Sequence, residues 1–191
     1  MSNTRSRLLI AVAAIVIGAG AAGGVGVVSA GANPMVGGAA MSSSKNIVEN
    51  ALNSKDHTTL VAAVKAAGLV DTLEGAGPFT VFAPTNEAFD KLPPGTVQTL
   101  VAPENKDMLT KILTYHVVPG HLTASDLKRM IAAGGGKAML TTVEGESLTV
   151  SEGGMGRLVL TDAKGGMSTI TIANVMQSNG VIHVVDSVLM P

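Results

Sequence analysis

The spacing of apolar residues changes part-way along this chain. Up to about residue 133 apolar residues recur every three or four positions, which is the spacing of amphipathic helices, and helices are expected within 46–73, 104–115 and 125–133. The clearest apolar stripe runs along the segment from Glu104 to Tyr115. Its members are Met108, Leu109, Ile112 and Leu113.

From residue 139 onwards apolar and polar residues alternate instead, which predicts β-strands. Those strands are expected over 139–143, 147–151, 158–161, 169–173 and 181–189. One earlier strand, Phe79 to Phe82, is ended by Pro84 and leads into a short helix. A helix-rich first part and a strand-rich last part around one core predict an α+β domain.

The first 32 residues have the pattern of a signal peptide. Arg5 and Arg7 precede an uncharged apolar stretch from Leu8 to Ile17, and small residues suited to cleavage follow near position 30. The alternative is a retained anchor, because no charge occurs between Leu8 and Ala30, although the glycines there weaken a continuous helix. We therefore expect a secreted protein that meets a membrane only through an uncleaved leader.

Residues 33–44 are small and polar, which predicts a flexible tether between the leader and a folded domain over 45–191. Without the two leader arginines the chain has 11 basic and 14 acidic residues, a net charge of about −3. No basic cluster is interleaved with aromatic residues, so nucleic acid is not an expected partner. The absence of cysteine excludes disulfides.

The residues that commonly carry catalysis are not arranged for it. The chain has four histidines, and the spacing of His116 and His121 across Pro119-Gly120 matches no metal-binding pattern. No serine nucleophile motif, phosphate-binding loop or dinucleotide fingerprint occurs. We therefore predict neither an enzyme nor a metal or cofactor site.

Three segments of the sequence together resemble a known family. They are Thr80-Val-Phe-Ala-Pro-Thr-Asn-Glu-Ala-Phe89, the pair Tyr115-His116, and Asn179-Gly-Val-Ile-His-Val-Val-Asp-Ser-Val-Leu-Met-Pro191. In this order and spacing they resemble the signature segments of the fasciclin (FAS1) domain family, over about 45–191. The single exported copy also resembles the small secreted fasciclin proteins of bacteria, including the mycobacterial immunogenic type, although those relatives carry cysteines.

The resemblance implies a helical layer packed on a wedge of two β-sheets and a role in cell adhesion or matrix interaction, without catalytic machinery. It implies two candidate binding segments. The pair Tyr115 and His116 lies in a region associated with receptor binding in the family. Asn105, Lys106 and Asp107 begin a segment that resembles an integrin-binding motif of vertebrate fasciclin proteins. Met108 and Leu109 complete that segment, and the apolar stripe predicts that they face the core.

Each candidate also has a structural interpretation. Tyr115 and His116 can anchor a helix end through hydrogen bonds, which is the interpretation that we favour, and Asn105 to Asp107 can be an ordinary solvated helix start. His183 is expected to be a buried, hydrogen-bonded core residue, and Asp186 is expected to fix a turn or cap a backbone amide.

Two functions follow from the sequence. The first is an exported adhesion module that binds protein or glycan at the cell surface or in the matrix. The alternative is a soluble extracytoplasmic domain that binds a small ligand in an apolar crevice. With three Phe, one Tyr and no Trp there are few aromatic platforms, which favours protein contacts.

Overall fold

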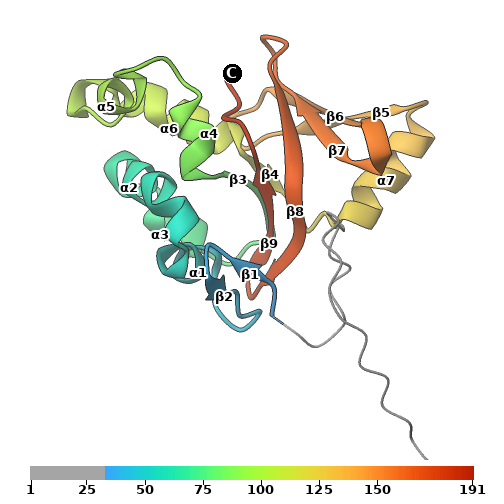
Figure 1. Ribbon diagram of the computed structural model, residues 1–191, viewed down its shortest axis with the longest axis horizontal. Helices are drawn as coiled ribbons and strands as arrows, with labels where there is room; N and C mark the ends of the chain where they lie inside the picture. Colours follow the sequence, from blue (N-terminus) through green and yellow to red (C-terminus); the bar gives the residue numbers. More distant parts are fainter. Residues whose placement is uncertain (1–32) are drawn as a thin grey trace, which may run out of the picture. The chain divides into compact units, whose positions relative to one another are not determined.

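The two apolar segments that stand furthest apart in the sequence lie side by side in the fold. In the computed structural model, which describes residues 33–191, strand β3 (Phe79–Pro84) pairs in parallel with β9 (Gly180–Val185). Their register places Val81 opposite Ile182 and Phe82 opposite His183. The first parts of the chain's two signature segments are therefore neighbouring interior strands of one sheet (Figure 1).

The remaining strands extend this sheet on both sides of the β3–β9 pair. The strand order is β4-β3-β9-β8-β7-β6-β5, and every pair except β3–β9 is antiparallel. The other five strands are β4 (Val117–Pro119), β5 (Lys137–Thr141), β6 (Ser147–Glu152), β7 (Leu158–Thr161) and β8 (Met167–Gln177).

The long strand β8 turns this sheet into a wedge. It pairs with β7 through its first residues and with β9 through the rest, and its register shifts twice between Ile170 and Val175. Such bulges bend a strand, so β8 joins two sheets that face each other. The wedge closes on its other side, where the Val143 N–H donates to the Val117 carbonyl at 2.8 Å.

Most helices form a layer on one side of this wedge, and one helix packs at the other (Figure 1). The layer comprises α1 (Ile47–Asn53), α2 (Thr58–Ala67), α3 (Val70–Glu74), α4 (Asn86–Asp90), α5 (Thr96–Leu100) and α6 (Lys106–Tyr115). Helix α7 (Ala124–Ala133) instead packs on β5 and β6. Short 3-10 turns occupy Lys55–His57 (η1), Pro103–Asn105 (η2) and Gly154–Gly156 (η3).

Local sequence signals explain where several helices begin and end. Asn46 and Glu49 form a reciprocal capping box at the start of α1, and Thr123 and Asp126 do the same for α7. Gly68 ends α2 in the left-handed conformation, which glycine adopts without a steric penalty. Along residues 33–191 no helix combines the length and the apolar character that crossing a bilayer requires.

Two hydrophobic cores lie on the two faces of strands β3 and β9. Val81 and Ile182 point into the core beneath α1, α2 and α6, whereas Phe82 and Val185 point into the core inside the wedge, beside α7. Because β3 and β9 are buried on both faces, their sequences are almost continuously apolar. The predicted α+β class and the helical layer on a wedge of two sheets are confirmed.

The structure corrects one expectation about the N-terminal part. Part of the predicted flexible tether is a small hairpin, β1 (Met35–Val36) and β2 (Ala39–Ala40), followed by the buried Met41. Val36 is also buried, and the two side chains supply apolar area that holds the hairpin against the helical layer. The leader expected over 1–32 lies outside the described residues.

Candidate functional site

The beginning of α6 presents three consecutive exposed side chains to solvent. Lys106, Asp107 and Met108 are all exposed, and we call them the α6 patch. Asn105, the third polar candidate of this segment, is only half-exposed, because its side-chain amide donates to the Thr99 carbonyl at 2.8 Å and so fastens η2 to α5. The patch therefore sits on a fixed helix start and offers a cation, an anion and a thioether.

The orientation of Met108 was predicted wrongly. Its side chain is 57% exposed, whereas Leu109, Ile112 and Leu113 are buried. These three follow the i, i+3, i+4 spacing of one helix face, and Met108 lies about 100° away from Leu109 around the helix. The buried face of α6 is therefore narrower than the apolar pattern in the sequence, and Met108 lies on the surface.

Tyr115, at the other end of α6, has no exposed surface. Its hydroxyl donates to the Ser147 carbonyl and accepts from the Ala163 N–H, both at 3.1 Å. Burial raises the pKa of the phenol, because it disfavours the phenolate, so the side chain stays protonated. Tyr115 thus connects α6 with β6 and with the turn that follows β7.

His116 is equally enclosed, with 2% of its surface exposed. Its Nδ1 lies 2.8 Å from the Ile112 carbonyl, and the Leu189 N–H donates to its Nε2 at 3.0 Å. Because a carbonyl only accepts and an N–H only donates, the ring is neutral with its proton on Nδ1. Burial lowers the pKa of His116 to about 4.

The structure therefore does not bring the two sets of candidate residues together. The α6 patch is outside at the start of the helix, and Tyr115 and His116 are inside at its end. This arrangement supports the structural interpretation of the Tyr-His pair. A molecule in contact with the α6 patch of the folded domain does not touch either buried ring.

His183 and Asp186 occupy the positions expected of them. His183 is buried, its Nε2 donates to the Leu122 carbonyl at 2.8 Å, and its ring stacks on Phe82 with centroids 5.7 Å apart. The Asp186 carboxylate accepts from the Thr169 N–H at 2.8 Å, which joins the end of β9 to β8. Both residues hold strands in place.

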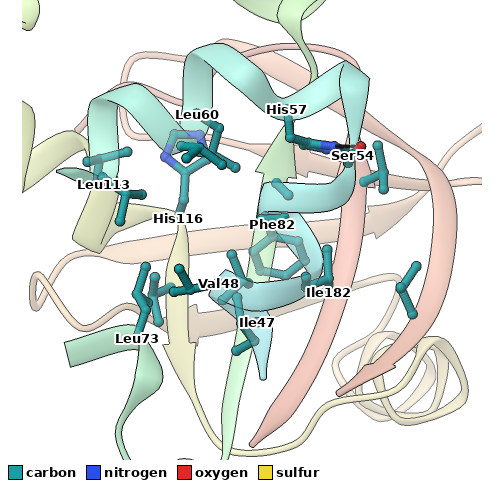
Figure 2. A pocket seen from close by; sticks show the side chains of 18 of the residues that line it. Ile47, Val48, Ser54, His57, Leu60, Leu73, Phe82, Leu113, His116 and Ile182 are labelled. Carbon is teal, nitrogen blue, oxygen red and sulfur yellow. Dashed lines mark hydrogen bonds between the residues drawn. The ribbon is translucent and has the colours of Figure 1, made fainter. Parts of the chain in front are cut away.

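A second feature, which the sequence did not localise, is a cavity of about 50 Å³ between the helical layer and β3 and β9. Figure 2 shows apolar side chains of α1, α2 and α6 around it, together with Ile182 from the sheet. Its polar lining includes His57 and Ser54, which lie beside each other at one end. The only sequence signal for this site is a histidine at the break between two helices.

Comparison with known proteins settles the family. The fasciclin-domain family profile matches residues 55–191, which is more than two thirds of the chain. The chain belongs to the fasciclin family. The fasciclin domain is known as a non-enzymatic domain of the adhesion type.

Relatives of this fasciclin protein come from bacteria and from animals. It is 48% identical over 155 residues to protein sll1483 of Synechocystis, covering 80% of this chain and 77% of that protein. It is 38% identical over 146 residues to the immunogenic protein MPB70 of Mycobacterium bovis, covering 74% and 66%. It is 37% identical over 132 residues to the pig transforming growth factor-beta-induced protein ig-h3, covering 69% of this chain but 17% of that protein.

Among solved structures, the chain resembles a FAS1 domain pair from the insect cell adhesion molecule fasciclin I. The TM-score is 0.69 at 21% identity, over 77% of this chain and 51% of that one. At this identity the likeness concerns the fold. One copy of this fasciclin domain therefore corresponds to about half of the insect pair.

Proposed function

We propose that this chain is an exported fasciclin module that attaches to a protein at the cell surface or in the extracellular matrix. The observation that carries the proposal is the α6 patch, three adjacent exposed side chains on a fixed helix start, in a family whose members include an insect cell adhesion molecule. The leader-like sequence over 1–32 supports export.

The chemistry of the patch favours a protein partner over a glycan. Met108 offers flexible apolar contact area, and Lys106 and Asp107 beside it can pair with charges of opposite sign. The chain has one Tyr and no Trp, and that Tyr is buried, so an aromatic platform for sugar stacking is not offered there.

The test compares two matched surface variants with the wild type, each coated on beads and applied to cells and to extracellular matrix. One carries Lys106→Ala, Asp107→Ala and Met108→Ala. The control carries Lys137→Ala, Met139→Ala and Glu146→Ala, which removes an exposed lysine, methionine and acid from the β5–β6 side of the molecule (Figure 1).

The proposal predicts that the α6 variant loses at least tenfold in binding and the control loses less than twofold. If only the control variant loses binding, the partner binds on the β5–β6 side and not at the α6 patch. Failure of wild-type beads to bind cells or matrix overturns the adhesion function. Export is tested separately, by whether the protein is found in culture supernatant with its N-terminus beyond residue 30.

A further inference from the structure

The cavity beneath the helical layer combines an apolar wall with one unsatisfied polar atom. The His57 side chain is 3% exposed, and among the described residues its Nε2 finds no hydrogen-bond partner. Its other nitrogen, Nδ1, lies 2.8 Å from the Ser54 hydroxyl. A buried polar atom without a hydrogen-bond partner destabilises the fold. A bound ligand or water that forms a hydrogen bond with Nε2 would remove this cost.

The position of the proton on His57 follows from its surroundings. When the Ser54 hydroxyl donates to Nδ1, the ring proton lies on Nε2, which is the nitrogen without a partner. Burial lowers the pKa of His57, so the ring is a neutral donor.

A single water does not account for the space beside this donor. A water molecule needs roughly 10–15 Å³ and two to four polar partners, whereas the cavity measures about 50 Å³ and most of its lining is apolar. Val48, Leu60, Val64, Leu73 and Ile182 are part of that lining. Empty apolar space costs packing contacts, so a molecule that is mostly hydrocarbon gains free energy by filling it.

We propose that this cavity binds a small uncharged molecule with an apolar body and one acceptor oxygen, and that the oxygen accepts a hydrogen bond from His57 Nε2. The class comprises short-chain ketones and alcohols. A carboxylate is excluded from this position, because a neutral imidazole does not compensate a buried negative charge. The lysine at the rim, Lys65, is exposed and leaves the interior uncharged.

The N-terminal hairpin forms part of the enclosure. Val36 and Met41 both line the cavity and are buried, and the Lys55 N–H donates to the Gly37 carbonyl at 3.3 Å, next to the Ser54–His57 turn. Residues 33–54 precede the part of the chain that the family profile matches. The closure of this cavity therefore uses residues from outside the matched region, and the site is separate from the α6 patch.

The test uses 2-butanone, butyrate and xenon as probes, followed by NMR of the full domain with 15N-labelled histidine. Wild type is expected to bind 2-butanone saturably, with a shift of the His57 ring resonances, and xenon saturably, with the two competing. Butyrate is expected to leave the His57 resonances unchanged.

Three variants separate the contributions. Ala51→Leu fills the half-buried lining of α1 and is expected to weaken both 2-butanone and xenon at least tenfold, whereas Ala62→Leu, on the exposed side of α2, changes neither. His57→Phe keeps the apolar volume, so xenon binding stays and 2-butanone binding falls about tenfold, the effect of one lost hydrogen bond.

The proposal is overturned if 2-butanone gives no saturable shift, if Ala51→Leu binds it as wild type does, or if only a water resonance is found beside His57. Where His57→Phe does not fold, the comparison of Ala51→Leu with Ala62→Leu decides the outcome. Loss of adhesion in the α6 patch variant leaves all of these results unchanged, because the α6 patch does not line the cavity.

Discussion

The imidazole of His116 joins the end of α6 to Leu189, 73 residues further along the chain. The Leu189 N–H donates to Nε2 at 3.0 Å, while Nδ1 donates to the Ile112 carbonyl one helical turn back. One neutral ring thereby satisfies a carbonyl at the helix end and an amide of the C-terminal segment. Protonation of Nε2 removes the acceptor for the Leu189 N–H, so this connection depends on pH.

The first prediction is that the unfolding free energy falls as the pH drops from 6.5 towards 4. The pKa of His116 is about 4 in the folded protein, below the ordinary value of 6.5, so the unfolded chain binds the extra proton within that window. The contribution of His116 to the unfolding free energy is fully present above pH 6.5. It falls by roughly 3 kcal/mol as the pH drops to about 4. The pKa values of His57 and His183 are lowered too, which adds to the loss.

The share of His116 is measured by denaturant titration over this pH range. His116→Phe is expected to destabilise the protein at pH 7 by about 2–5 kcal/mol, since it leaves two buried backbone groups unpaired. It also removes about one proton from the uptake on unfolding between pH 6.5 and 4. The control is His121→Ala, which changes an exposed histidine and is expected to keep the pH dependence of the wild type. If His116→Phe shows a pH dependence as steep as that of the wild type, the assignment to His116 is contradicted.

The second prediction concerns two neighbouring glycines in the N-terminal hairpin. Both have positive φ, +58° at Gly37 and +75° at Gly38, but a Cβ on Gly37 would lie 2.4 Å from Ser54 Oγ, whereas one on Gly38 meets nothing within 4 Å. Gly38→Ala thus reports the backbone cost alone, about 1–2 kcal/mol. Gly37→Ala is expected to lose a further 1–3 kcal/mol or so by displacing the hairpin.

Chemical denaturation gives these two stabilities, and hydrogen exchange of the Lys55 amide, which donates to the Gly37 carbonyl, reports the displacement directly. Equal losses in the two variants, with unchanged exchange at Lys55, mean that the hairpin is not packed on the Ser54–His57 turn.

The third prediction is that Tyr115→Phe costs stability without affecting binding. The substitution keeps the ring and deletes the hydroxyl, leaving the Ser147 carbonyl and the Ala163 amide without their partner. A loss of about 1–3 kcal/mol in unfolding free energy is expected. Reduced binding to cells or matrix at a temperature where the variant is fully folded is the contrary result, because it gives the phenol a role in recognition.

The fourth prediction explains the asparagine that opens the second signature segment. Asn179 accepts from the Ile47 N–H at 3.1 Å and donates to the Leu73 and Gly75 carbonyls at 2.7 and 3.0 Å, so it ties α1 and the end of α3 to β9. Asn179→Ala is expected to lose about 2–4 kcal/mol by thermal or denaturant unfolding.

Asn53→Ala is the matched control for this variant, because Asn53 is exposed and its amide makes a single surface hydrogen bond to the Glu49 carbonyl. We expect it to change stability by less than about 0.5 kcal/mol. Similar losses in the two asparagine variants mean that the three contacts of Asn179 do not carry the stability assigned to them.

The sequence predicted the elements of this fold better than their pairing. The strand expected over 158–161 is β7, and the helix expected to end at residue 133 is α7. The spacing of apolar residues reflects which face of a single helix or strand is buried, so it predicts individual elements such as β7 and α7. The parallel pairing of β3 with β9 joins segments about one hundred residues apart, and nothing in either strand's own pattern specifies it.

The same limit explains the errors at the candidate site. Met108 and Leu109 are both apolar, and only the packing of α6 decides which of them is buried. The hairpin over 35–40 has two-residue strands, too short for an alternating pattern, and it is held by tertiary contacts of Val36 and Met41. The tyrosine and histidine were recognisable in sequence, but their burial required the positions of β6 and Leu189.

The central claim is that the two ends of α6 have separate tasks, with binding at its exposed start and structure at its buried end. The most direct measurement compares Asp107→Ala and His116→Phe for both bead binding to cells or matrix and melting temperature, with binding measured well below the melting transition. We predict that Asp107→Ala binds more weakly with an unchanged melting temperature, and that His116→Phe melts several degrees lower with unchanged binding. Weakened binding in His116→Phe together with normal binding in Asp107→Ala would contradict the account.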